Sequence, residues 1–334
     1  MRFGFFPSTS PLLHPETNRL LRTWKALAPQ DYITLAYCLW MAMMALRAHG
    51  ALATRVQQLT LSMVVCVVIL GFRGGLWLGN VALWLYRSSL LAALQIPYFL
   101  LRDLLPAAIT GTVDDMLLRL DTALFGVAPS LWLDGLITPG RTEWFAFFYF
   151  SYFLILAIHV LPILFLERRS TVAQHFAVGM LGVFAVGQAT YFLLPGYGPY
   201  HHMEGQFQNA LPGGFWMDTV WRTVQSGGAM LDIFPSLHTA GPLFIALFSF
   251  QHRALQPFRY TWPIAAFFSV NIIGATLYLR WHYAVDVLAG VMLAVAWFFL
   301  TPYLIQRDQE RRRTETTVPA WPEPIPLDDS VRKR

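Results

Sequence analysis

The sequence predicts an all-α, polytopic membrane helix bundle. Of its 334 residues, 56% are hydrophobic, 15% are aromatic and only 13% are charged, a balance that excludes an ordinary soluble domain. Several separate runs of near-spanning length carry no charge, such as 144–166 and 260–279. Within lipid, a helix satisfies its own backbone polar groups over such a length. The chain is therefore expected to be an integral membrane protein.

Eight apolar runs are predicted to form membrane helices. In chain order they are 31–48, 56–72, 76–101, 143–166, 171–194, 236–251, 259–280 and 283–305. In the third run Arg87 lies in the middle and three glycines loosen the start, so a re-entrant or interfacial segment is the alternative there. Cys38 and Cys66 both fall inside apolar runs, where they behave as small hydrophobic residues rather than as a disulfide framework.

The segment between the third and fourth runs has the pattern of an interfacial amphipathic helix. Apolar residues recur there at helical spacing, opposite a face that carries most of the charge. The apolar residues are Val113, Met116, Leu117, Leu120 and Leu124, and the charged ones are Asp114, Asp115, Arg119 and Asp121. "DDMLLRLD" lacks the third acid of a metal-binding aspartate motif, so we interpret Asp114 and Asp115 as helix-start acids on a solvated face.

The chain divides into three parts. Residues 1–30 lack the apolar core and cleavage site of a signal peptide, and are expected to stay as a cytoplasmic segment. Residues 31–305 form the helical membrane domain. Residues 306–334 carry Arg311, Arg312 and Arg313 followed by four prolines, and are predicted to be a disordered basic cytoplasmic tail.

The positions of the arginines predict the orientation. Cytoplasmic loops are enriched in basic residues, so 168–169, 253–259 and the tail are expected inside. Alternating the helices places 102–142, 195–234 and the start of the last helix on the non-cytoplasmic face, with both termini in the cytoplasm. The arginine-rich, lysine-poor composition suggests a bacterial plasma membrane, although a Golgi-type membrane would have the same topology. The net charge of +5 is spread over short loops and one tail, which argues against a nucleic-acid partner.

Three polar clusters fall on the predicted non-cytoplasmic face, each where a helix begins or ends. They are "LPGYGPYHH" (194–202), "FPSLHTA" (234–240) and "RWHYAVD" (280–286). His282 and Asp286 are four residues apart, so the carboxylate can hold one imidazole nitrogen and leave the other as a base or nucleophile. Pro235 suits a first helical turn, which leaves the amides near Ser236 available to an anion. A histidine with a carboxylate partner, close to helix-start amides, is typical of a site for phosphoryl transfer without a metal.

"FPSLH" followed some forty residues later by "HYAVDVLAG" resembles the second and third signatures of the type 2 phosphatidic acid phosphatase superfamily. Leu237, where many phosphatases of that superfamily have Gly, is similar to the inositolphosphorylceramide synthase branch, as is the segment "DDMLLRLDTALFGVAPSLWLD". The resemblance covers about 114–305 and implies a six-helix catalytic core. It implies that His282 is the nucleophile, Asp286 its orienting partner, His238 the acid and then base, and Ser236 a phosphate ligand.

The sequence also departs from the superfamily's pattern. The first signature needs a lysine, but the only lysines are Lys25 and Lys333, so a lysine clamp on phosphate is excluded. The third signature often has Arg six residues before its His, where this chain has Thr276, and Arg280 is the candidate to replace it. "GYGPYHH" stands where the synthase branch has a turn with Pro and Tyr, which makes Tyr200 and His201 candidates for binding phosphate or head group.

The sequence therefore predicts a metal- and cofactor-independent enzyme that moves an inositol-phosphate-type head group from a phospholipid to a lipid hydroxyl, through a phosphohistidine. The alternative keeps the same site but uses water as the acceptor, which makes the protein a lipid phosphate phosphatase. A third hypothesis, a transporter with His282 and Asp286 as a proton relay, predicts polar groups on both membrane faces, whereas the clusters fall on one. His159 and His175 are interpreted as packed membrane histidines.

Overall fold

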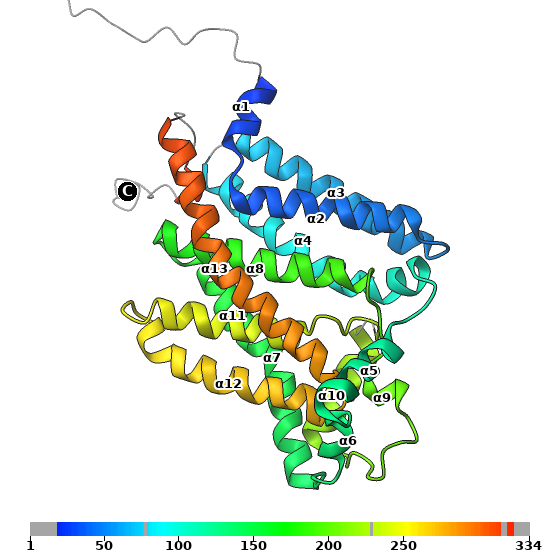
Figure 1. The fold of residues 1–334 in the computed structure, drawn as a ribbon. Coiled ribbons are helices and arrows are strands. Elements are labelled where there is room, and N and C mark those ends of the chain that lie inside the picture. The colour runs from blue at the N-terminus through cyan, green and yellow to red at the C-terminus, as the bar shows by residue number, and fades with distance from the viewer. Residues whose placement is uncertain (1–18, 77–78, 228–229, 315–318, 324–334) are drawn as a thin grey trace, which may run out of the picture.

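A computed structural model describes residues 19–76, 79–227, 230–314 and 319–323, and residues 1–18 of the predicted N-terminal segment lie outside these ranges. Thirteen helices and no strand are found in these residues (Figure 1). They are α1 (Arg19–Ala26), α2 (Pro29–Arg47), α3 (Leu52–Arg73), α4 (Gly79–Ala108), α5 (Asp114–Phe125), α6 (Pro129–Asp134), α7 (Pro139–Phe165), α8 (Ser170–Tyr191), α9 (Pro199–His202), α10 (Phe215–Gly227), α11 (Leu237–Gln251), α12 (Phe258–Tyr278) and α13 (Ala284–Thr314).

All eight predicted runs are helical, which confirms a polytopic helix bundle. Within the described ranges, six helices are long and apolar enough to cross a bilayer: α3, α4, α7, α8, α12 and α13. Of the other two, α11 has only 15 residues, fewer than the roughly 20 that span a bilayer alone. The 19-residue α2 starts with Pro-Gln-Asp, and buries Gln30 and Asp31 in its first turn.

The ambiguous third run is one helix, α4, which is continuous through Arg87. The guanidinium is almost fully buried and donates to the carbonyls of Leu164 (3.1 Å) and Pro322 (2.8 Å). Because protein carbonyls accept from both terminal nitrogens of the guanidinium, the arginine does not break the helix or expose its charge to lipid. The re-entrant alternative for this segment is therefore wrong.

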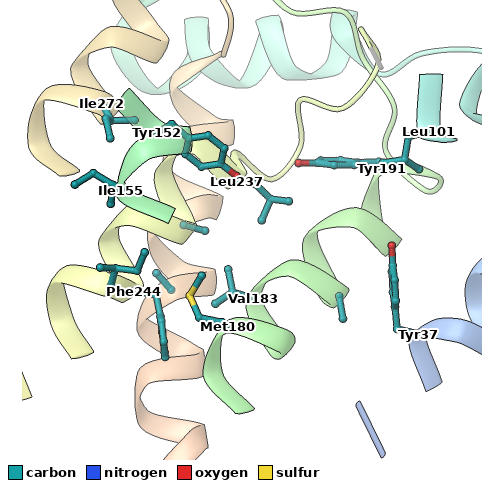
Figure 2. Close-up of a cluster of buried hydrophobic side chains, with 14 of the residues drawn as sticks. Tyr37, Leu101, Tyr152, Ile155, Met180, Val183, Tyr191, Leu237, Phe244 and Ile272 are labelled. Carbon is teal, nitrogen blue, oxygen red and sulfur yellow. The ribbon is translucent and has the colours of Figure 1, made fainter. Parts of the chain in front are cut away.

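The core of the bundle forms around α8, which buries side chains on almost all of its sides. Figure 2 shows side chains of α2, α4, α7, α11 and α12 packed around Met180, Val183 and Tyr191 of that helix. Glycines in α8 allow the close approach, since a Cβ at Gly179 would lie 1.9 Å from the Phe244 ring. Small residues at such crossings let membrane helices pack closely.

Helix α5 forms where the amphipathic pattern predicts, but the prediction that its acidic face is solvated is wrong. Asp114 and Asp121 are each only 1% exposed, while Leu120 and Leu124 on the apolar face are 44% and 62% exposed. The helix therefore buries two of its three carboxylates together with Leu117, and directs Leu120 and Leu124 outward. Asp115, with its side chain 81% exposed, and Arg119 follow the expectation.

The predicted disordered tail is also corrected for the part that the structure describes. Residues 306–314 continue α13, and Trp321 is buried against α2, α3 and α4. Arg73, which pairs with Asp31 at 2.6 Å, also donates to the carbonyls of Pro319 (3.1 Å) and Ala320 (2.8 Å). The prediction of disorder rested on composition alone. Composition does not reveal that a buried arginine of the membrane domain binds the backbone of 319–320. Residues 315–318 and 324–334 lie outside the described ranges.

The two ends of the bundle differ. Arg311 and Arg312 near the end of α13 donate to carbonyls at the end of α1, so α1 and the tail lie at the same end. Helices α5, α6, α9 and α10 gather at the opposite end, where α13 begins (Figure 1). The three polar clusters of the sequence all reach this second end.

Candidate active site

The three polar clusters converge on one another through their backbones. The Tyr200 amide donates to the Arg280 carbonyl (2.8 Å), which joins the first cluster to the third. The Ser236 amide donates to the Asp286 carbonyl (3.1 Å), which joins the second to the third. Two glycines permit this close approach of the backbones. Gly198 has φ +89°, and a Cβ there would lie 2.4 Å from the Trp281 carbonyl oxygen. A Cβ at Gly290 would lie 2.5 Å from the Ser236 carbonyl oxygen.

His238 and His282 line one cavity of about 360 Å³, with their ring centroids 6.2 Å apart. The His238 ring is held between Tyr149 (4.4 Å) and Tyr152 (4.1 Å), and its Nε2 has no hydrogen-bond partner among the described residues. This nitrogen can therefore exchange a proton with a ligand in the cavity.

Asp286 lies behind His282, away from the cavity. Its Oδ2 is 3.5 Å from the His282 Nδ1, close to the ring nitrogen but without a hydrogen bond. The same oxygen accepts from the Tyr283 amide at 2.9 Å, and the carboxyl is fully buried. Because Nδ1 faces the carboxylate, Nε2 is the His282 nitrogen left to attack a ligand.

His282 belongs to the short connection between α12 and α13, and burial lowers its pKa to about 4. Asp232 and the Ile233 carbonyl act in the opposite direction, because both stabilise the imidazolium. The pKa of Asp232 is raised by burial, which outweighs the main-chain amides and His282 that stabilise its charge. The imidazole of His282 is therefore neutral at pH 7, as a nucleophile must be.

Two more cavity residues carry polar groups that a ligand can use. Tyr200, a predicted site residue, lines the cavity, and burial raises its pKa to about 12, so its phenol remains a hydrogen-bond donor. Asp232 also lines the cavity, although the sequence analysis missed it. A carboxylate two residues before "FPSLH" was a signal that could have found it.

Three other predicted site residues do not line this cavity. Ser236 is fully buried, and its Oγ caps α11 by accepting from the Thr239 amide (3.3 Å). Arg280, at φ +67°, donates to the Asp134 carboxylate (2.6 Å) and the Asn209 carbonyl (2.6 Å), and its guanidinium covers the Phe207 ring. His201 is exposed and stacks on Tyr197. Arg280 therefore shapes the surrounding loops, and is not aimed at a phosphate in the cavity.

The buried carboxylates of α5 hold the loops beside His282 in place. Asp114 accepts from the amides of Tyr197 (3.0 Å) and Gly198 (2.9 Å) and from the Tyr283 hydroxyl (3.2 Å). Asp121 accepts from the amides of Ala284 and Val285, each at 2.9 Å, at the N-terminus of α13. A carboxylate is favourable there because it satisfies free amides at the positive end of the helix dipole.

The structure also limits two other interpretations. Leu237, one of the features that resemble the synthase branch, packs against Gly187, where an added Cβ would lie 2.5 Å from its Cδ2. It does not line the catalytic cavity. Within the described part of the chain, no group of three or more His, Cys, Asp or Glu side chains is arranged to hold a metal ion.

Comparison with known proteins agrees with this geometry. The family model described as "PAP2 superfamily" matches residues 115–300, more than half of the chain. The matched range contains His238, His282 and Asp286, together with the helices that carry the cavity's catalytic wall. A search of curated proteins and a search of solved structures each find no match. The paired motifs and the family match thus lead to one conclusion: the chain belongs to the type 2 phosphatidic acid phosphatase (PAP2) superfamily.

Proposed function

We propose that the protein transfers a phosphate-containing head group, of the inositol-phosphate type, from a phospholipid to the hydroxyl of a second lipid. The observation that carries the proposal is the placement of His238 and His282 on one cavity wall, with Asp286 behind His282. Two histidines facing a common space can divide the work of nucleophile and proton carrier.

The proposed reaction has two steps. In the first, the neutral His282 Nε2 attacks phosphorus, the bond from phosphorus to the diacylglycerol oxygen breaks, and His238, which begins as the imidazolium, gives its proton to that oxygen and becomes neutral. In the second, His238 takes the proton of the acceptor hydroxyl, whose oxygen attacks phosphorus while the bond to His282 breaks. Asp286 stabilises the positive charge that the imidazole carries while it is phosphorylated.

The charge of the cavity favours a phosphodiester donor over a phosphomonoester. Among the described residues that line it there is no lysine or arginine, and Asp232 is the one acidic residue. A monoester carries a charge of about −1.5 to −2 at neutral pH. A diester carries a single negative charge and is repelled less by Asp232. This favours head-group transfer over hydrolysis of phosphatidic acid, the alternative that uses the same residues with water as acceptor.

A second cavity supports a lipid as the substrate. It has a volume of about 280 Å³ and is lined mainly by apolar side chains of α4, α7 and α8. Tyr98 and Phe153 line both this cavity and the catalytic one, so the two adjoin. A phospholipid can place its phosphate beside His282 and part of its hydrocarbon in the apolar cavity.

The test follows phosphate label in purified protein given labelled phosphatidylinositol or phosphatidic acid, with mixed lipid alcohols. We expect label in a new organic-phase lipid, lost in His282→Ala and retained in His49→Ala, a matched change at an exposed histidine. Release of inorganic phosphate that depends on His282 would establish the phosphatase instead. Equal turnover by His282→Ala and the wild type would overturn both.

A further inference from the structure

We propose that Asp232 and Trp281 form a head-group subsite in the catalytic cavity, which selects phosphodiesters whose head group donates hydrogen bonds. Hydroxyl groups of a polyol and the N–H groups of an ammonium share this chemistry. The inference rests on the proposed function and deepens it, because it names the class of donor lipid.

The backbone holds Asp232 in place at the cavity wall. Asp232 pairs with Gly196 in a parallel bridge, and the Gly196 amide donates to the Leu231 carbonyl (3.2 Å). The neighbours Leu231 and Ile233 are buried, at 4% and 5% exposure, and anchor the loop on both sides. Asp232 itself is half-buried and lines the cavity together with His282 and Tyr200. The loop therefore presents a carboxylate to the space that a substrate must enter.

The carboxylate has room to accept further hydrogen bonds. Main-chain amides of Met230 and of Asp232 itself are its hydrogen-bond donors in the structure, and a carboxylate has about four acceptor positions. No described lysine or arginine lines the cavity, and Arg280 is committed to Asp134 and Asn209. Donors for the remaining positions must therefore come from the ligand or from neutral groups. A second negative charge on the ligand would be unfavourable beside it.

Trp281 supplies a neutral donor on the same wall. Its indole is 6% exposed and lines the cavity, and its Nε1–H has no hydrogen-bond partner among the described residues. The ring is fixed by Tyr200 (4.6 Å between centroids) and Trp221 (5.1 Å). A buried N–H without a partner is costly, so a phosphate oxygen that accepts from it gains a well-placed donor. A single neutral donor suits a monoanionic phosphodiester.

The first experiment measures lipid binding without turnover. His282→Ala protein is titrated with vesicles of phosphatidylcholine that contain phosphatidylinositol, phosphatidylethanolamine or phosphatidic acid. Adding Asp232→Asn should weaken binding of phosphatidylinositol, phosphatidylethanolamine or both by roughly 10- to 100-fold, the loss of a charge-assisted hydrogen bond. Phosphatidic acid should bind as well or better. The lipid that loses affinity identifies the head group as polyol or ammonium.

Matched changes separate the subsite from a general structural effect. Asp218→Asn removes an exposed carboxylate of α10 and should leave all three affinities unchanged. Trp281→Phe should weaken all three lipids by about fivefold, the worth of one neutral hydrogen bond to a shared phosphate. Trp221 packs on Trp281 but does not line the cavity, so Trp221→Phe should leave the binding of all three lipids unchanged. An equal loss for every lipid in Asp232→Asn, or no loss for any, would overturn the role of Asp232.

Failure of the subsite and failure of the proposed function can be told apart. If labelled head group is transferred in a His282-dependent way but Asp232→Asn leaves the preference among lipids unchanged, the subsite is wrong and the function stands. If the binding preference depends on Asp232 while no lipid is turned over, the function is wrong and the site is a binding site.

Discussion

At the scale of single residues, Asp286 is the most direct test of the mechanism. Its carboxylate lies 3.5 Å from the His282 Nδ1 and is fully buried, so it faces the charge that develops when Nε2 bonds to phosphorus. Asp286→Asn keeps the acceptor for the Tyr283 amide but removes that charge. We expect kcat to fall by about 100- to 10,000-fold, as when a buried carboxylate behind a catalytic histidine is neutralised. Initial rates and trapped phosphoenzyme measure it, and a near-normal kcat would exclude Asp286 from the mechanism.

The pKa of His282 predicts how activity depends on pH. Burial lowers it to about 4, so the acid limb of kcat/KM, where the nucleophile becomes protonated, should lie near that value, while the other limb reports loss of the proton that His238 must donate. The groups that face it are Asp232, Asp286 and His238. Asp232 stabilises the imidazolium and raises this pKa, so Asp232→Asn should move the acid limb to still lower pH. A profile of kcat/KM against pH, measured on a phosphodiester for the wild type and Asp232→Asn, checks both predictions. An acid limb near 6.5, the ordinary pKa of histidine, would contradict them.

The motifs predicted which residue types meet, but not where each side chain points. Three of the predicted site residues, His238, His282 and Tyr200, line the cavity. Each lies at a helix end, and the fold brings these ends together. Ser236 and Arg280 occupy the same motifs but face other partners, a helix cap and the Asp134 carboxylate. Asp134 lies far from Arg280 in the sequence, so no local pattern could show that the arginine is already paired. Asp232, by contrast, lies two residues before "FPSLH" and could have been found from that local position.

At the scale of elements, α5 positions the start of α13. Asp121 accepts from the amides of Ala284 and Val285, two and three residues after His282 in the chain. Asp121→Ala should leave two amides unpaired and let the catalytic loop shift, lowering kcat by roughly 10- to 100-fold. Thermal stability should also fall. Asp121→Asn, which keeps an acceptor oxygen, should restore part of the rate.

The control lies on the same helix. Asp115 has an 81% exposed side chain and contacts His202 at 3.2 Å, a surface pair worth little. Asp115→Ala should therefore leave kcat and the unfolding temperature almost unchanged. Equal effects from Asp115→Ala and Asp121→Ala would mean that α5 acts only as a general scaffold. Rates and thermal unfolding of both variants in the same detergent decide between these outcomes.

The same helix shows what periodicity can and cannot predict. The spacing of 113–124 correctly predicts a helix with an apolar and an acidic face. Asp114 and Asp121 are buried nevertheless, because their carboxylates find loop amides as partners inside the protein. Leu120 and Leu124 face outward, which is favourable where lipid surrounds the protein. Periodicity identifies the faces, whereas tertiary hydrogen bonds determine which one is buried.

At the scale of the whole molecule, the bundle separates its charged termini from its catalytic end. Arginines at the end of α13 bind α1 carbonyls at one end, and the histidine cavity forms at the other. If the basic end is cytoplasmic, the site faces the opposite side. Alkaline phosphatase fused after Trp221, in α10 beside the cavity, should then be active. A fusion after Arg253, in the basic α11–α12 turn, should be inactive, and the reverse result would invert the orientation.

The apolar cavity should determine how the enzyme responds to the length of a lipid chain. Three helices build it, and α4 lies outside the residues that the family match covers, so this wall was not predictable from the motifs.

Ala177 of α8 lines the cavity and is 4% exposed, so Ala177→Phe fills space where hydrocarbon would bind. We expect KM for long-chain phospholipids to rise several-fold, with little change for short-chain analogues that bind through the head group. Val186→Phe places the same aromatic ring at a 43% exposed position on α8 and should change neither value. A chain-length series of phospholipids, measured with all three proteins, gives the result. If Ala177→Phe lowers activity equally at every chain length, the cavity supports the packing of α8 and does not bind the chain, and the catalytic cavity would have to recognise its substrate by the head group alone.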